Sequence, residues 1–223
     1  MSARELLLRQ DRSFLDFARS LTPRQWAMPS LCSQWTTHEV LAHLVIGSSM
    51  SVPSLCRELA VHRMNFDRTN AVVAQRLAYE YAPEALMDSF ELLAERRHGI
   101  GKLFPPTLLM GDHVMHHLDI ALALGEQVDV ADEIIHAVLD AEVGIANPFV
   151  PAKRNASDLV LRASDTGWAF TAGRGALGVV VGEAAHIASA LAGRPHALAF
   201  LEGDGVVVLR TRIEPPIAGR NVV

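Results

Sequence analysis

Cysteine is scarce in this chain, in which Cys32 and Cys56 are the two cysteines among 223 residues. Two thiols this far apart are too few for a disulfide framework, and they do not have the paired spacing of a cysteine-based zinc site. We therefore expect both cysteines to be reduced thiols.

Runs of positive charge and long apolar runs are also missing. The formal net charge is -5 at pH 7 and Lys and Arg form no cluster, so nucleic acid is not an expected partner. No apolar run reaches the about 18 residues of a membrane span, and the N-terminal segment MSARELLLRQDRSF carries charges where a signal peptide needs an apolar stretch. We expect a cytoplasmic protein without a membrane partner.

The chain has enough apolar sequence for a sizeable core, since half of the residues are hydrophobic.

Local signals mark the ends of the predicted helices. A Thr36/Glu39 capping box starts one helix, and Gly125 ends another. The segment 52–70 has a weaker apolar pattern and is expected to be a helix end and loop. Short breaks between long helices favour an antiparallel bundle over residues 1–150, whose core can host a metal. Apolar residues at helical spacing predict helices over 3–20, 37–49, 83–100, 107–125 and 130–147.

The hydrophobic period changes from 3.6 to 2 between Asn147 and Ala156, across two prolines. The segments 159–162 and 168–171 flank the turn signal Asp-Thr-Gly and predict a β-hairpin. A third strand is expected over 177–181, a helix over 183–191 and a last strand over 205–212. The fold class is therefore predicted to be α+β, with a small α+β domain over residues 151–223 after the bundle.

The segment LLMGDHVMHHLDIALALG, residues 108–125, places polar side chains in an apolar, helix-patterned stretch. Asp112 and His116 are four residues apart, so on a helix they lie on one face, one turn apart, as paired metal ligands do. His113 and His117 have the same spacing, and periodicity alone does not choose between the two pairs. A further ligand has to come from elsewhere in the chain.

His43 is a candidate for that ligand because it borders the apolar stripe of its predicted helix. Together with Asp112 and His116 it supplies two imidazoles and one carboxylate, the ligand set of an open, catalytic type of site for zinc or a similar divalent ion. The alternatives are that His43 is a core histidine bonded to a backbone carbonyl, and that Asp112 and His116 pair only with each other.

The same residues carry a resemblance to a known family. LTPRQW followed by PSLCSQWTTHEVLAHL, and then GDHVMHHLDIALALG, resemble the two motifs of the mycothiol-dependent maleylpyruvate isomerase-like proteins, which belong to the DinB-like four-helix metalloproteins. The C-terminal segment with LAGR, residues 191–194, is similar too. The resemblance implies a DinB-like bundle with His43, Asp112 and His116 as its metal ligands, and it disfavours His113 and His117. Asp112 departs from the family pattern, in which the acidic ligand is commonly glutamate.

The resemblance also implies a function, namely a thiol-dependent isomerase or S-transferase that uses a divalent metal, zinc first, and mycothiol or a similar low-molecular-weight thiol. The metal would favour the thiolate, which would attack a small electrophilic acid.

Arg194 is the candidate catalytic residue that would hold a substrate carboxylate. The alternative is that Arg194 is a surface arginine after a helix end. A metal-dependent hydrolase that activates water and a non-enzymatic protein for association or small-molecule binding stay open, and an oligomer is compatible with the sequence.

Overall fold

The protein is described from a computed structural model, which covers residues 1–127, 130–147, 149–173 and 177–214. By its internal contacts the chain forms two compact units, Met1–Asp129 and Val130–Val223. Each unit is described by itself below. Within the described residues, no helix combines the length and the apolar character needed to cross a membrane.

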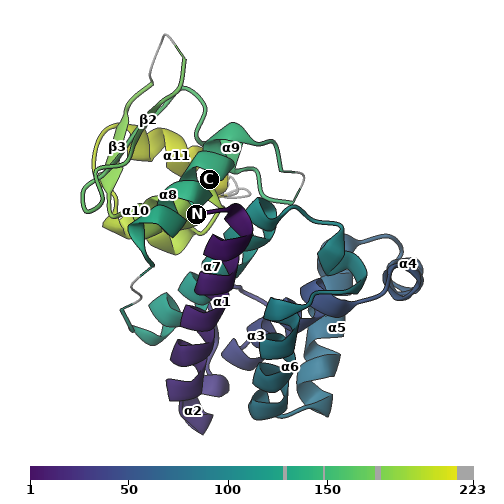
Figure 1. The fold of residues 1–223 in the computed structure, drawn as a ribbon. Helices are drawn as coiled ribbons and strands as arrows, with labels where there is room; N and C mark the ends of the chain where they lie inside the picture. The colour runs from purple at the N-terminus through teal and green to yellow at the C-terminus, as the bar shows by residue number, and fades with distance from the viewer. Residues whose placement is uncertain (128–129, 148, 174–176, 215–223) are drawn as a thin grey trace, which may run out of the picture. The chain divides into compact units, whose positions relative to one another are not determined.

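The N-terminal unit is helical (Figure 1), and its main core takes buried residues from α1, α2, α3, α6 and α7. α1 contacts α6 and α7, and α3 contacts α5, α6 and α7. The largest fully buried side chains of this core include Phe14, Phe90 and Leu41. In chain order its helices are α1 (Ala3–Ser20), α2 (Pro23–Trp26), α3 (Thr37–Ser49), α4 (Val52–Val61), α5 (Phe66–Glu80), α6 (Pro83–Glu95), the 3₁₀ helix η1 (Gly99–Lys102) and α7 (Pro106–Leu124).

The helix boundaries follow the local signals in the sequence. α3 begins with the expected capping box, in which the Thr36 side chain accepts from the Glu39 N–H and the Glu39 side chain accepts from the Thr36 N–H. α7 ends at Gly125, whose φ of 71° is the left-handed conformation that glycine adopts without strain. The helix expected over 83–100 is shorter than expected, since α6 ends at Glu95 and η1 follows.

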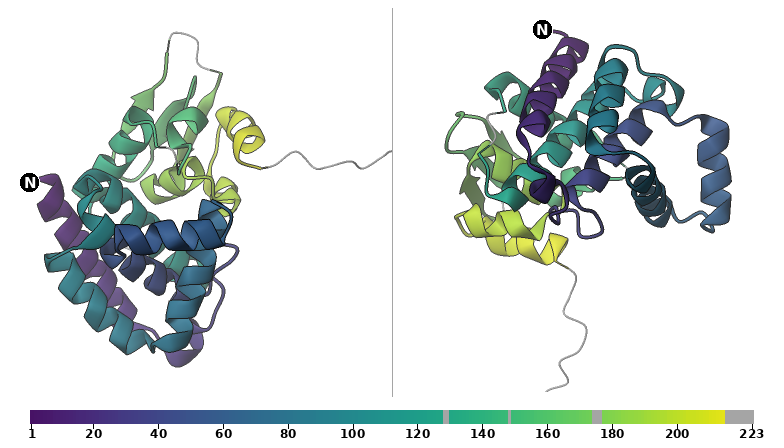
Figure 2. Two further views of the ribbon diagram at one scale, coloured as in Figure 1. Left: turned by 90° about the vertical axis from the view of Figure 1, so that its right-hand side faces the viewer. Right: turned by 90° about the horizontal axis from the view of Figure 1, so that it is seen from below.

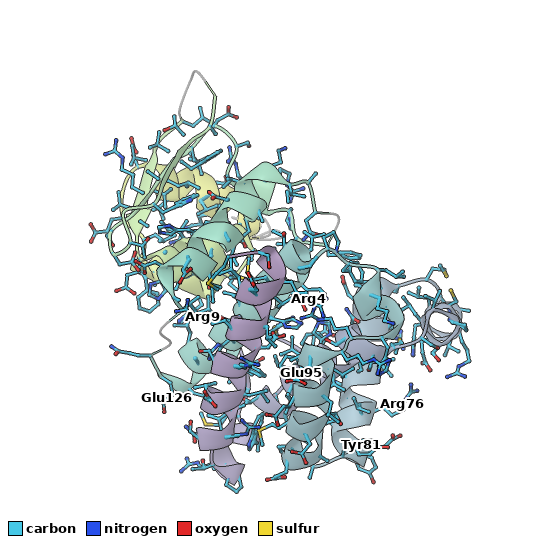
Figure 3. The ribbon with its side chains drawn as sticks, in the orientation of Figure 1. Arg4, Arg9, Arg76, Tyr81, Glu95 and Glu126 are labelled. Carbon is cyan, nitrogen blue, oxygen red and sulfur yellow. The ribbon has the colours of Figure 1, made fainter. Side chains whose placement is uncertain are left out.

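The segment 52–70 differs from the sequence expectation, because it holds all of α4 and the start of α5. α4 lies at the side of the bundle beyond α5 (Figures 1 and 2). Its one buried residue is Glu58, and Arg76 of α5, labelled in Figure 3, brings its Nη2 within 3.0 Å of the Glu58 Oε1. The helix is therefore held partly by charge, which explains why its apolar pattern is weak.

The C-terminal unit is a small α+β fold, as the sequence predicted. β1 is the central strand; it pairs antiparallel with β2, Leu161 opposite Phe170, and parallel with β3, Leu161 opposite Val180. In chain order the elements are α8 (Asp132–Gly144), α9 (Ala152–Asn155), β1 (Val160–Ala163), β2 (Ala169–Thr171), β3 (Val179–Gly182), α10 (Ala184–Leu191), the 3₁₀ helix η2 (Pro195–Phe200) and α11 (Gly205–Ile213).

The last strand expected over 205–212 is wrong, because this segment forms the helix α11. Three consecutive valines favour a strand locally, but the fully buried Leu209 stands four residues after the buried Gly205, and Val207 is 67% exposed. Gly205 also lies so close to the backbone of Gly178 and Val179 that a Cβ would collide with it. Tertiary packing therefore decides the structure of this segment.

The helix α8 groups with the C-terminal unit, whereas the sequence analysis placed its residues in the bundle and put the boundary near residue 150. α8 packs against α10 and α9. Trp168, at the start of the β2 segment, donates its indole N–H to Asp140 of α8 at 2.9 Å. An apolar helical pattern predicts the helix but does not reveal which core buries it.

His117 of α7 is a buried histidine of the bundle core. Its ring packs against Phe14 and Phe17, and the Gln10 side-chain amide donates to its Nδ1 at 3.0 Å. Burial lowers the pKa of His117 from 6.5 to about 4. The folded protein therefore holds this ring in its neutral form.

We expect this histidine to make folding stability fall as the pH is lowered from 6.5 to 4. In that window the unfolded chain binds a proton at His117 that the folded chain does not, so the contribution lost is about 1.4 kcal/mol for each pH unit. Urea unfolding of the wild type and of His117→Gln across this range measures it. The variant should show a flatter dependence, and identical slopes would contradict the assignment.

Candidate metal centre

The structure brings His43, Asp112 and His116 together, from α3 and α7. The Asp112 Oδ1 lies 3.9 Å from the His43 Nε2 and 3.6 Å from the His116 Nε2. One ligand atom from each of the three residues lies within 4.8 Å of the others. The i, i+4 spacing on α7 and the capped start of α3 thus place three donor atoms around one point.

These separations suit a divalent cation. Two ligand atoms that are each ~2.1 Å from a tetrahedrally coordinated ion are ~3.4 Å apart, so the observed 3.6 and 3.9 Å need only a small contraction. Two neutral imidazole nitrogens and a carboxylate oxygen are ligands that zinc accepts. A set of three protein ligands leaves coordination space for another molecule.

The two histidines are shielded, but the carboxylate is accessible. His43 and His116 are 9% and 6% exposed, whereas 42% of the Asp112 side chain is exposed. Access to the three donor atoms is therefore from the side of Asp112. A small molecule arriving there meets a negative charge flanked by two aromatic rings.

The protonation of the three groups reflects their mutual contact. Burial raises the pKa of Asp112, but the charge of His116 and a hydrogen bond with His43 outweigh it and hold this pKa below its usual value. Burial lowers the pKa of His43, and the hydrogen bond with Asp112 only partly offsets it. Burial also disfavours charge on His116, but the neighbouring Cys32, Asp112 and Asp119 raise its pKa well above 6.5. A cation bound here would replace the proton of His116 as the partner of Asp112.

Trp35 forms one wall of the site, a role that the sequence analysis did not assign. Its indole stacks on the His43 ring, with centroids 4.7 Å apart and an interplanar angle of 26°, and lies 5.8 Å from the His116 ring. Trp35 directly precedes Thr36, the N-cap of α3. The sequence signal that could have indicated this role is an aromatic residue directly before the N-cap of α3, the helix that carries His43.

Cys32 also reaches the site, whereas the sequence analysis expected a reduced thiol and assigned it no role in a site. Its Sγ donates to the Asp119 Oδ2 at 2.9 Å and lies 3.6 Å from the His116 Nδ1. The His116 Nδ1 is 3.2 Å from the same Asp119 oxygen. Cys32, His116 and Asp119 are therefore a second group whose donor atoms converge, on the other side of the His116 ring.

The competing pair His113 and His117 is directed to α1. The His113 Nδ1 lies 2.5 Å from the Asp11 Oδ1, whose carboxylate is fully buried and also accepts from Arg97 at 3.2 Å. His117 is bonded to Gln10, as described above. Both rings thus have partners within the helical core, and neither belongs to a group of converging ligand atoms among the described residues.

Arg194, the candidate catalytic residue, belongs to the C-terminal unit. It is the N-cap of η2, and its Nη1 donates to the Ala192 carbonyl at 2.9 Å. Burial raises the pKa of Glu142 of α8 well above its usual value, and the charge of Arg194 opposes this shift. The role of Arg194 toward a substrate stays a prediction.

We expect His113→Leu to destabilise the fold and to leave bound metal unchanged. The substitution removes a donor from the buried Asp11 carboxylate, which costs about 1–3 kcal/mol, whereas the ring makes no part of the converging set. Urea unfolding and elemental analysis on the same preparation measure both effects. A variant that loses metal while keeping its stability would reverse the assignment.

Comparison with known proteins identifies a similar fold. Residues 7–103 match the family model of the mycothiol maleylpyruvate isomerase N-terminal domain, a range that contains His43. A crystal structure of the mycothiol-dependent maleylpyruvate isomerase is similar, with a TM-score of 0.56, 15% identity and 91% of each chain covered. A structure of a histidine-to-alanine mutant of that enzyme is similar to the same degree, at 16% identity. No curated protein matches the chain. The fold is thus similar to that of the isomerase, and the match over residues 7–103 supports the resemblance that the motifs indicated.

Proposed function

We propose that the chain binds a divalent metal ion, zinc first, through His43, Asp112 and His116, and uses it in thiol-dependent chemistry on a small electrophile. The observation that carries the proposal is the convergence of two imidazole nitrogens and one carboxylate oxygen from α3 and α7. The match of residues 7–103 to the mycothiol maleylpyruvate isomerase N-terminal domain supports it, and so does the fold shared with a solved mycothiol-dependent isomerase.

Zinc fits the donor set better than the harder cations. Magnesium and calcium favour shells of oxygen ligands, whereas this set has two imidazole nitrogens. Asp112 is one methylene shorter than the glutamate common in the family, yet its Oδ1 lies within 4 Å of both ring nitrogens. These distances support the shorter carboxylate of Asp112 as a ligand.

When bound, the ion would supply the charge that turns a coordinated low-molecular-weight thiol into its thiolate, the nucleophile for addition to an activated double bond. Addition of the thiol, rotation about the carbon–carbon bond that has become single, and elimination of the same thiol isomerise the substrate. Addition or displacement alone transfers the thiol to the substrate. The protein contributes the Trp35 wall, which covers the His43 ring. Asp112 occupies the accessible side, so it borders whatever molecule enters.

Arg194 is proposed to bind the carboxylate of an acidic substrate. The support is chemical, because a guanidinium offers a planar fork of donors that matches a carboxylate. Replacing Arg194 by Lys keeps the charge but removes the fork. If the proposal holds, Arg194→Lys raises the KM for acidic substrates while metal content stays the same.

We expect His43→Ala to abolish tight metal binding and thiol-dependent turnover while the bundle stays folded. Two protein ligands hold a catalytic ion too weakly against water, whereas the apolar faces of α3 are buried without help from a metal. Metal stoichiometry, turnover and melting temperature are measured on the same preparation.

His38→Ala is the matched control, since His38 lies on the same helix but packs its ring against Trp26. This control should keep the metal even if it melts earlier. Unchanged metal content in His43→Ala would defeat the proposal.

The reaction class is tested by supplying the wild-type protein with zinc, mycothiol and maleylpyruvate or another activated unsaturated acid. The proposal expects conversion only when both zinc and thiol are present. Hydrolytic cleavage of the substrate that needs zinc but no thiol would instead identify a hydrolase that activates water. Tight zinc binding without turnover of any electrophile would favour a binding protein.

A further inference from the structure

Asp119 is a buried carboxylate that joins the ligand helix α7 to the loop before α3. It is 1% exposed, and its Oδ2 accepts from both the Cys32 Sγ, at 2.9 Å, and the His116 Nδ1, at 3.2 Å. Its backbone carbonyl accepts from the Leu31 N–H at 2.9 Å. A single residue thus holds the loop through its main chain and its side chain.

The loop itself is closed by Ser30. The Ser30 Oγ donates to the Trp35 carbonyl at 2.9 Å and accepts from the Cys32 N–H at 3.1 Å. The loop therefore presents Cys32 to Asp119 at one end and Trp35 to His43 at the other. Both histidines of the metal centre are thus braced by the same short segment.

The contact with Asp119 decides which nitrogen of His116 carries hydrogen. An ionised carboxylate only accepts hydrogen bonds, so the neutral imidazole beside it carries its hydrogen on Nδ1. The lone pair is then on Nε2, the nitrogen that lies 3.6 Å from Asp112. This is the tautomer that a metal at the centre requires.

We propose that Asp119 is a positioning residue for the metal centre, which fixes the tautomer and the ring orientation of His116, and that the Cys32 thiol is the second donor that holds its carboxylate in place. The inference rests on the proposed metal site and deepens it. It assigns to Cys32 a hydrogen-bonding role, not that of a metal ligand. The distances from the Cys32 Sγ and the His116 Nδ1 to the Asp119 Oδ2 favour this assignment, because both are hydrogen-bond distances to the same oxygen.

The test is the affinity for zinc, measured by competition with a chromophoric chelator. We expect Asp119→Ala to bind zinc about 10- to 100-fold more weakly than the wild type. Cys32→Ser keeps a donor and should bind nearly as the wild type does, whereas Cys32→Ala should be weakened several-fold. Wild-type affinity in Asp119→Ala would overturn the proposal.

Asp11→Asn is the matched control, because Asp11 is also a buried carboxylate paired with a histidine of α7, but that histidine is not in the converging set. It should lower stability and leave the zinc affinity unchanged. Cobalt substitution gives a further outcome. An intense near-ultraviolet sulfur-to-cobalt band that Cys32→Ala abolishes would make Cys32 a ligand and overturn its assigned role.

A measurement on the metal-free protein tests the role of Asp119 independently of the proposed metal-dependent function. Nitrogen-15 NMR of the metal-free protein, at an alkaline pH where His116 is neutral, reports its tautomer. We expect hydrogen on Nδ1 in the wild type and a shift toward Nε2 in Asp119→Ala. A wild type that binds no divalent ion would refute the metal site alone, and the inference about Asp119 would then stand or fall on this tautomer.

Discussion

The burial of polar side chains on α7 is the constraint on which the site depends. Every residue from His113 to Ala121 is buried, and a buried polar group without a partner costs about 1–3 kcal/mol. The three histidines of this stretch therefore each need a partner. His113 and His117 find theirs on α1, in Asp11 and Gln10. His116, in contrast, faces Asp112 on one side and Asp119 on the other. This difference in partners separates the candidate metal centre from the core.

The scaffold that carries the centre does not need a metal for its packing. Val40, Leu41 and Leu44 are essentially inaccessible in the core that α3 shares with α1 and α6, and they flank His43 in sequence. The ligand positions are thus fixed by apolar burial on two helices, and the loop with Cys32 and Trp35 adds a polar brace on α7 and a ring on His43. Rigid elements of this kind hold donor atoms in place for an incoming ion.

The sequence predicted what local rules determine and missed what packing determines. The Thr36/Glu39 box, Gly125 and the hairpin around Asp165 have local signals, and each is found as expected. Residues 205–212 were misassigned because their valines favour a strand, whereas the segment forms a helix in which Gly205 lies close to the Gly178 backbone and Leu209 is buried. Residue spacing could not distinguish the pair Asp112 and His116 from the pair His113 and His117. The reason is that α7 is buried on nearly all sides and has no clear polar face. Cys32 and Trp35 reach the site because of the conformation of their loop. The hydrophobic periodicity of the sequence does not predict the conformation of a loop.

The proposed cation binds among His43, Asp112 and His116. The most direct measurement is an anomalous difference map, at the zinc absorption edge, from crystals of the protein grown with zinc. We expect a peak at ~2.0–2.2 Å from the His43 Nε2, an Asp112 oxygen and the His116 Nε2. A map without a peak there, or a peak bound instead by Cys32, Asp119 and the His116 Nδ1, would contradict it.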